Sequence, residues 1–100
     1  MDNKYYIIAG NAAESNTFAK KKAQDFWNLG ISHITLSHFI YVDSRERLLG
    51  LKNPSGFFIG TWKDHPNIES IMIALAGAVS NDIGKTKLIQ ELWKEMREPK

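Results

Sequence analysis

The sequence predicts an α/β fold: a three-stranded parallel sheet, half-Rossmann-like in the order βαβαβαα and flanked by helices. Three apolar segments are continuous rather than alternating, as expected of strands that are buried on both faces. Amphipathic stretches separate these segments, and parallel neighbours require crossovers of that kind. The chain has 100 residues, 43% hydrophobic and 24% charged, so we expect one domain over residues 1–100.

The opening of the chain predicts a strand and a helix. The run Tyr5–Ala9 is rich in aromatic and β-branched residues and stops at a Gly-Asn pair, which is typical of a strand end. Between Glu14 and Leu29 the apolar residues recur at helical spacing, which predicts an amphipathic helix. Gly30 follows where a left-handed helix cap is expected.

The middle of the chain predicts a second strand followed by a short helix. Residues 31–37 alternate weakly and fit either an irregular approach or a short edge strand, whereas Phe39–Val42 is the stronger strand. Asp43 and Glu46 have the spacing of a capping box, so we expect a short helix over Arg45–Leu51.

The remainder predicts a third strand and two helices. Gly56–Thr61 is an apolar run bounded by glycines, the pattern of an interior strand. Pro66 precedes a helix with apolar positions at i, i+3, i+4 and i+7, and Leu88–Met96 marks a final amphipathic helix that ends before Pro99. Small residues would let the final helix, or a second copy of the chain, approach the preceding helix closely: Ala74, Ala76, Gly77 and Ala78.

The direction of the strands predicts where a ligand would bind. In open parallel sheets, ligands lie beyond the carboxyl ends of the strands, where the strand order reverses. Orders 2-1-3 and 3-2-1 both satisfy the handedness rule. The residues after the strands suit a small polar ligand such as a nucleotide, although ordinary turns have a similar composition. The candidate ligand-binding residues are Gly10, Asn11, Asp43, Ser44, Gly60, Thr61, Trp62 and Asp64.

The sequence contains no strong catalytic or metal-binding motif. It has no cysteine, which excludes disulfides, zinc–thiolate sites and cysteine nucleophiles. Gly84–Thr86 has the ending of a phosphate-binding loop, but Val79 stands where that loop requires a glycine. His65 beside Asp64 is a weak candidate general base, because adjacent residues rarely face one another. We predict no catalytic residue, no metal and no cofactor.

Aromatic and basic residues are adequate for an interface. Trp27 and Trp93 fall on apolar stripes and are predicted to lie in the core, whereas Trp62 follows a strand and is predicted to be a partly exposed binding anchor. Lys20–Lys22 and the lysines of the final helix make weak nucleic-acid binding an alternative, but the net charge is only +2. Interleaved glutamates in that helix favour a solvated, ion-paired face.

The sequence also predicts a cytoplasmic protein with no membrane partner. The N-terminal apolar run is too short for the core of a signal peptide. The longest apolar stretch, Ile71–Val79, is about nine residues, against the roughly 20 that cross a bilayer.

Two segments resemble small uncharacterised bacteriophage proteins. They are Leu48–Trp62, which reads LLGLKNPSGFFIGTW, and the opening run Tyr5–Asn11, with further similarity at Asn67–Ile71. Together they cover about a third of the chain, on the scale of a two-element motif. The resemblance transfers no catalytic residue. It implies that the chain acts by binding, as small phage products that inhibit or sequester host or defence components do.

These observations favour a non-enzymatic binding module, encoded by a phage and directed at a host or anti-phage defence protein in the host cytoplasm. The alternative is a protein that binds or sequesters a small nucleotide or phosphorylated ligand at the strand ends. In that alternative Asn11, Ser44 and Thr61 donate hydrogen bonds and Trp62 stacks on a base. Weak nucleic-acid binding and a homodimer stay open as further alternatives.

Overall fold

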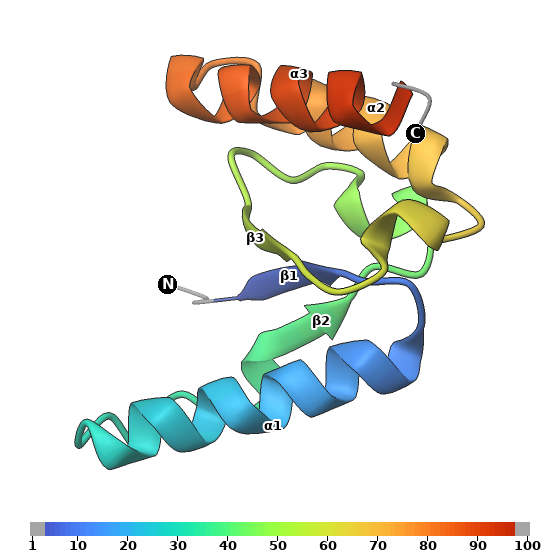
Figure 1. The fold of residues 1–100 in the computed structure, drawn as a ribbon. Coiled ribbons are helices and arrows are strands. Elements are labelled where there is room, and N and C mark those ends of the chain that lie inside the picture. The colour runs from blue at the N-terminus through green and yellow to red at the C-terminus, as the bar shows by residue number, and fades with distance from the viewer. Residues whose placement is uncertain (1–3, 98–100) are drawn as a thin grey trace.

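A sheet of three parallel strands forms the centre of the protein, in a computed structural model that describes residues 4–97 (Figure 1). β1 (Tyr5–Ile8) lies in the middle, between β2 (Phe39–Tyr41) and β3 (Ser55–Phe58). Both pairings of β1 are parallel, and the strand order is β2-β1-β3. The predicted α/β fold with a parallel sheet is confirmed, and of the two allowed strand orders the chain adopts 2-1-3.

Helices cover both faces of this sheet, which gives three layers (Figure 1). α1 (Ala12–Asn28) packs on one face, while α2 (Ile68–Ala78) and α3 (Ile83–Arg97) lie on the other. Three short 3₁₀ turns complete the connections: η1 (Leu36–His38), η2 (Arg45–Leu48) and η3 (Trp62–Asp64).

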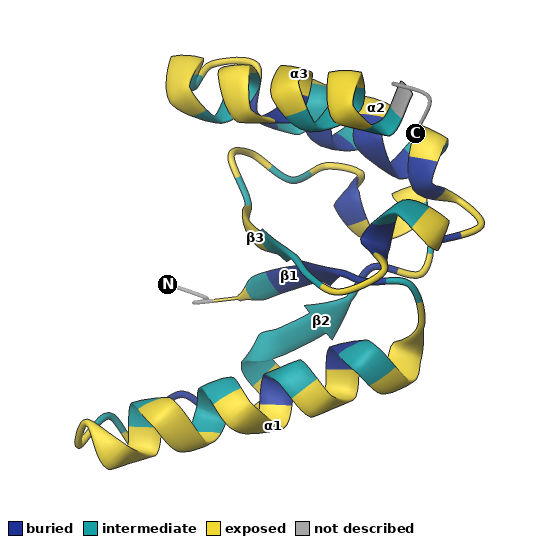
Figure 2. Cartoon of the chain, in the orientation of Figure 1, coloured by how far each residue is buried: buried dark blue, intermediate teal, exposed yellow. Residues whose placement is uncertain are grey.

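Most of the core lies on the α2 side of the sheet (Figure 2). Alternate residues of a strand point to opposite faces, so Tyr6 and Ile8 face α2 while Ile7 faces α1. The larger cluster contains Ile71 and Met72, both fully buried. On the α1 side, three residues make up the buried cluster: Ile7, Ala9 and Ala19.

The two long amphipathic helices begin earlier than predicted because polar side chains cap them. α1 begins at Ala12, since the Asn11 side chain accepts the backbone N–H of Glu14 at 2.9 Å. α3 begins at Ile83, where the Asp82 carboxylate accepts the N–H of Lys85 at 3.0 Å. The predicted left-handed Gly30 is confirmed, with φ +84°. Pro99, predicted to follow the last helix, lies outside the described residues.

Two predictions in the middle of the chain were wrong in detail, and one open alternative is decided. Of the two possibilities for residues 31–37, the structure has the irregular approach and no edge strand; the chain turns into η1, where the Thr35 N–H donates to His38 Nδ1 at 3.0 Å. The short helix predicted over Arg45–Leu51 is only the 3₁₀ turn η2, and Gly50 then takes φ +78°. The Asp43 carboxylate accepts from Arg47 at 3.2 Å rather than forming the predicted capping box.

The third strand is shorter at its carboxyl end than the sequence predicted. It ends at Phe58, although the Ile59 N–H still donates to the Ile8 carbonyl at 3.0 Å. Gly60 then adopts a φ of +52°, which turns the chain away from the sheet and towards α1. This turn places Thr61 beside the N-terminus of α1.

Candidate functional site

The parallel strands carry the predicted ligand-binding residues to one edge of the sheet. β1 and β3 are neighbours, so Gly10, Gly60 and Thr61 come together there. A Cβ built on Gly10 would lie 2.0 Å from Thr61 Oγ1. The chain at this edge is therefore packed too closely for any residue but glycine at position 10.

The side chain of Glu14, which the sequence analysis did not select, lies between these two loops. Its Oε1 accepts the N–H of Gly10 at 2.9 Å and that of Thr61 at 3.1 Å. Its Oε2 accepts the Thr61 hydroxyl at 3.0 Å. Glu14 thus ties the start of α1 to the carboxyl ends of both β1 and β3. The Asn11 cap three residues earlier, which shares the first turn of α1, is the sequence signal that could have identified it.

These hydrogen bonds fix the charge of Glu14 and occupy its oxygens. The Gly10 N–H, followed by the Thr61 hydroxyl, lowers the pKa of Glu14 below its usual value of 4.5, although partial desolvation opposes the change. Each carboxylate oxygen already accepts two hydrogen bonds. Glu14 is therefore a structural tie and a poor general base.

The same arrangement bears on phosphate binding at this edge. A phosphate there would be expected to use the N–H groups of Gly10 and Thr61 and the Thr61 hydroxyl. All three donate to Glu14. An incoming phosphate would have to displace the Glu14 carboxylate from these donors. The edge thus resembles an anion-binding site that is already occupied by Glu14.

The other predicted site residues have local structural contacts. Asn11 caps α1, Ser44 stands at the N-cap position of η2, and Asp64 is exposed at the end of η3. Asp43 pairs with Arg47, and its carbonyl accepts from the Asn67 side chain at 3.0 Å. The Asn67–Asp43 hydrogen bond joins two loops, whereas the contacts of the Asn11 and Asp43 side chains are local.

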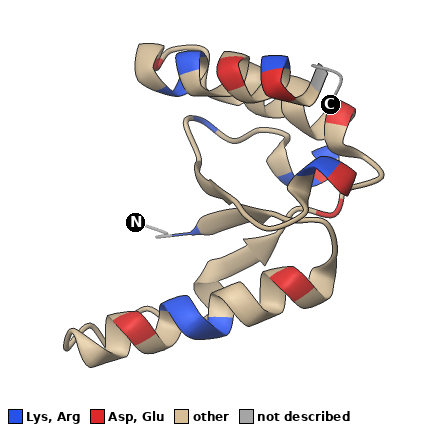
Figure 3. Cartoon of the chain, viewed as in Figure 1, with Lys and Arg blue, Asp and Glu red and all other residues tan. Residues whose placement is uncertain are grey.

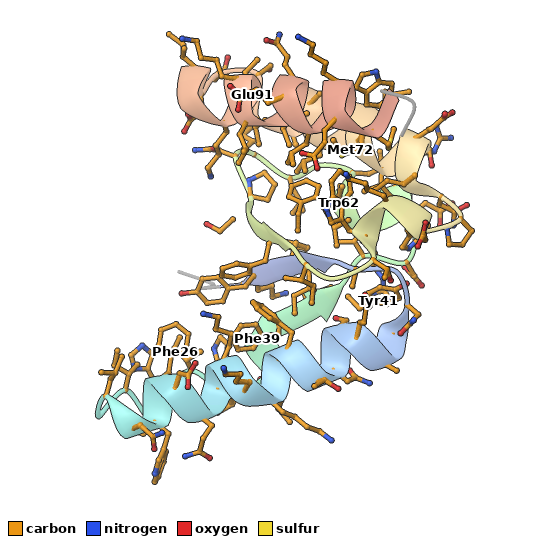
Figure 4. All side chains as sticks on the ribbon, viewed as in Figure 1. Phe26, Phe39, Tyr41, Trp62, Met72 and Glu91 are labelled. Atoms are coloured by element: carbon orange, nitrogen blue, oxygen red, sulfur yellow. The ribbon has the colours of Figure 1, made fainter. Side chains whose placement is uncertain are left out.

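The aromatic prediction for this edge was wrong. Trp62 is only 7% exposed, packs in the α2-side core and meets Phe58 edge-on, with ring centroids 5.1 Å apart (Figure 4). The short turn η3 directs its ring inwards, under α2, where it cannot stack on a base. Trp62 therefore stabilises the fold and is no exposed anchor.

His65 is likewise part of the interior. It is 3% exposed, and its Nδ1 accepts the backbone N–H of Asn67 at 2.9 Å, which leaves the hydrogen on Nε2 in the neutral ring. The Nδ1 position that a carboxylate would use to orient a catalytic histidine is thus occupied by the main chain. Its ring also lies against Tyr41, with centroids 5.8 Å apart. Burial, followed by the charges of Asp43 and Glu14, raises the pKa of Tyr41.

The exposed tryptophan is Trp27, which the sequence placed in the core. Its side chain is 64% exposed near the end of α1, with Leu29 76% and Leu36 49% exposed. A 17-residue helix is about 25 Å long, whereas a four-residue strand covers about 13 Å, so the end of α1 projects beyond the sheet (Figure 1). Trp27 has no sheet beneath it, although it continues the apolar stripe.

We use the name Trp27 surface for the open hollow that Trp27 and Leu36 line. The hollow has a volume of about 640 Å³ between α1 and the segment that leads into η1. It combines apolar side chains with hydroxyl, amide and ammonium groups. The residues that line it are Lys20, Ala23, Gln24, Trp27, Ser32, Ile34, Thr35, Leu36 and Ser37.

Basic charge lies next to the Trp27 surface. Lys20–Lys22 form one block on α1, with Glu14 and Asp25 as the acidic residues on either side (Figure 3). Lys22 lies over the rings of Phe18 and Phe57, 5.5 and 6.0 Å from their centroids. Lys20 and Lys21 are exposed. The surface is therefore apolar at its centre and positive at one margin.

Comparison with known proteins adds no function to this geometry. No protein-family model matches the chain, and neither the curated proteins nor the solved structures give a significant match. Across residues 4–97, no group of histidine and carboxylate side chains is arranged to hold a metal ion. None of the helices described there has the length and apolar content that a membrane span requires.

Proposed function

We propose that the chain is a non-enzymatic binding module that docks on another protein through the Trp27 surface. The observation that carries this proposal is the 64% exposure of Trp27 beside a large open hollow. Tryptophan is among the residues most enriched at the energetic centres of protein interfaces. A fold that can bury Trp62 but leaves Trp27 in solvent has an unused apolar anchor at this position.

The gain expected from covering this side chain is large for a single contact. A tryptophan buries about 150–250 Å² in an interface, and apolar burial contributes about 25 cal/mol per Å². Since about two thirds of the ring is still in water, docking would contribute about 2–4 kcal/mol from Trp27 before the costs of association. The hydroxyl and amide groups around the hollow can form hydrogen bonds with polar groups at the rim of the partner's surface.

The charge beside the hollow specifies the partner further. Lys20 lines the hollow and is exposed, so a partner with an acidic group beside an apolar centre complements this surface. The resemblance to small phage proteins makes a protein of the bacterial host, or of its defence against phages, the partner that we propose. Binding would then take place in the host cytoplasm.

Small-ligand binding at the strand ends has weaker support. Trp62 is buried and the amide donors of that edge bind Glu14, so neither the base nor the phosphate of a nucleotide has its expected contacts. A panel of nucleotides in a thermal-shift assay tests the alternative directly. A ligand at a hundredfold excess over its dissociation constant would add about 2.7 kcal/mol of stability. We expect no shift.

Affinity capture from bacterial lysate, with two variants of equal initial exposure, tests the proposed function. Trp27→Ala removes the anchor, whereas Leu49→Ala removes an apolar side chain that is also 64% exposed but lies after η2. We expect a protein that the wild type and Leu49→Ala retain and Trp27→Ala loses, with binding that weakens as salt is raised. Capture of no protein, or equal capture by Trp27→Ala, would contradict the proposal.

A nucleic-acid control separates protein binding from the lysine-based alternative. Stacking on Trp27 together with the three lysines would also suit a single strand. Mobility shifts with single-stranded DNA and RNA at low salt should show no complex. A complex that Trp27→Ala abolishes would replace the protein partner with a nucleic acid.

A further inference from the structure

We propose that a hollow at the amino ends of β1 and β3 binds a small dicarboxylate, a molecule that carries two carboxylate groups on a short carbon chain. The hollow has a volume of about 360 Å³, and residues 4–6 and 51–55 line it. Tyr5 is paired with Ser55 in the sheet, so Lys4 lies beside the loop that contains Lys52. We name this hollow the Lys4–Lys52 pocket. It lies at the opposite end of the strands from the Glu14 junction.

Four side chains in this lining carry hydrogen-bond donors that the protein does not use. They are the ammonium groups of Lys4 and Lys52, the amide of Asn53 and the hydroxyl of Ser55. All four residues are exposed, and within residues 4–97 none of their side chains makes a hydrogen bond or an ion pair. Among the same described residues, no aspartate or glutamate lines the pocket. An anion there would therefore meet two positive charges and no described carboxylate.

Contacts with α2 and α3 fix the loop that forms one wall of the pocket. The Asn53 N–H donates to the Ala78 carbonyl at 2.8 Å, and Lys85 Nζ donates to the carbonyls of Asn53 and Pro54 at 3.4 and 3.2 Å. Asn53 has a φ of +50°, in the left-handed region, where asparagine is one of the few non-glycine residues that occur readily. Lys85, the lysine of Gly84–Thr86, thus holds this loop in place. A wall that is already ordered reduces the entropy cost of binding a ligand.

The kinds of donor favour carboxylates over phosphate. Phosphate sites typically gather several backbone N–H groups around one anion. Here the N–H of Asn53 is already bound to Ala78, and Pro54 has none. The two ammonium groups belong instead to separate segments, with the apolar side chains of Leu51 and Pro54 in the same lining. Each carboxylate of the ligand can then bind one lysine while the carbon chain lies against the apolar residues.

The aromatic residues of the pocket are engaged by the protein itself. Tyr5 is stacked on Phe26 and Phe39, and Tyr6 is only 8% exposed. A nucleotide base would therefore find less to stack on than a solvent-exposed ring offers. The volume is also near the lower end of the range for ligand pockets, so a molecule of few atoms fits best.

The two lysines set the expected affinity. A single exposed ion pair contributes little, but two carboxylates on one molecule act together, because binding of the first holds the second near its lysine. We expect a dissociation constant of about 1–10 mM for the best dicarboxylate at low salt, and at least about fivefold weaker binding of a monocarboxylate such as butyrate. Added salt should weaken the binding of both by screening the charges.

Titrations of the isotope-labelled full chain, followed by NMR, test this site. The probes are malonate, succinate, glutarate and adipate, with butyrate and inorganic phosphate for comparison. We expect saturable shifts of the Asn53 and Ser55 amide signals, and an affinity that passes through a maximum as the chain lengthens, because only one length reaches both lysines. Lys4→Gln and Lys52→Gln should each reduce the affinity for dicarboxylates to that for butyrate. Lys87→Gln, at an exposed lysine of α3 outside the lining, should bind as the wild type does.

Three results would overturn this proposal. They are a lack of saturable binding of every dicarboxylate up to about 50 mM, an affinity for phosphate above that for all the dicarboxylates, or equal effects of Lys52→Gln and Lys87→Gln. The spectra themselves establish that each variant is folded. The full chain is used, so the residues outside 4–97 contribute to every measurement. Trp27→Ala should bind the dicarboxylates normally, so this pocket and the Trp27 surface can fail independently.

Discussion

The two faces of the sheet are buried by different means. On the α2 side, eleven buried hydrophobic residues from β1, the loops, α2 and α3 form one continuous cluster. On the α1 side the buried cluster, within residues 4–97, contains only Ile7, Ala9 and Ala19. Both helical layers nevertheless cover the same three short strands. The α2 side therefore holds most of the hydrophobic stabilisation, and the α1 side has the smaller buried cluster.

Aromatic rings take the place of a closed core on the α1 side. Tyr5 is stacked on Phe26 and Phe39, with centroids 6.1 and 5.3 Å away, and also meets Phe57 at 6.0 Å. All four rings are half-buried (Figures 2 and 4). Rings can cover a narrow strip of sheet with one face while the other remains accessible. Trp27 lies beyond this strip, where the end of α1 projects past the sheet, and is therefore exposed.

The largest effect that distinguishes the two faces should come from their tryptophans. We expect Trp62→Ala to lower the free energy of unfolding by about 3–5 kcal/mol, because a 7% exposed ring leaves a large cavity in the α2-side core. Trp27→Ala should change it by no more than about 0.5 kcal/mol, because that ring is mostly in solvent. Chemical denaturation followed by circular dichroism measures both.

A more conservative substitution, Trp62→Phe, keeps the prediction testable if Trp62→Ala does not fold. Trp62→Phe keeps an aromatic ring and should cost about 1–2 kcal/mol. Equal losses for Trp27→Ala and Trp62→Ala would contradict the asymmetry between the faces, and with it the argument that Trp27 is available to a partner.

A smaller effect is expected where the two faces are joined, at the turn after β3. Gly60 and Gly50 both have positive φ, +52° and +78°, so alanine should cost about 1–2 kcal/mol at each. A Cβ at Gly60 would also lie 2.8 Å from the Glu14 carboxylate, whereas one at Gly50 meets no atom within 4 Å. Gly60→Ala should therefore cost about 1 kcal/mol more than Gly50→Ala in the same denaturation assay.

Equal costs at the two glycines would show that Glu14 moves aside freely. In that case the carboxylate would not tie the α1 layer to β3. The comparison is informative because the backbone strain is similar in the two variants and only the neighbouring side chain differs.

The sequence was sufficient to predict the architecture because strands and helices are encoded by local patterns of apolar residues. The continuous apolar runs around Ile7, Ile40 and Phe57 identify strands, and the spacing of Ile68, Ile71 and Leu75 identifies α2. The strand order was not local information, since both candidate orders have the same handedness. Boundaries failed where single side chains decide them, as with Asn11 at the start of α1 and Asp82 at the start of α3.

The site residues depend on tertiary contacts that periodicity does not contain. Trp27 and Trp62 were assigned the wrong environments because the stripe of α1 extends past the sheet and η3 turns back towards the core. Glu14 was missed because its partners, Gly10 and Thr61, lie on different loops, and Thr61 is 47 residues away in the sequence. Charge patterns on one helix cannot reveal which distant amides a carboxylate will meet.

The smallest of these effects, and the one that isolates the junction between the layers, is the pH dependence that Glu14 contributes. Its pKa is lowered in the folded protein, chiefly by the Gly10 N–H, from the usual 4.5 of the unfolded chain. The folded state therefore releases this proton more readily. Its stabilising contribution is complete above pH 4.5 and is lost as the pH falls through the folded pKa.

Melting temperatures of the wild type and Glu14→Gln between pH 7 and pH 3 measure this contribution. We expect Glu14→Gln to melt lower at pH 7, since its amide offers only one acceptor oxygen to the donors on Gly10 and Thr61. The two curves should converge as the pH falls below 4.5, because the wild-type carboxyl group then also becomes neutral. Other carboxylates titrate in both proteins and cancel in the difference. A gap that stays constant down to pH 3 would mean that the charge of Glu14 does not hold β1 and β3 to α1, and the junction between the two faces would then depend on packing alone.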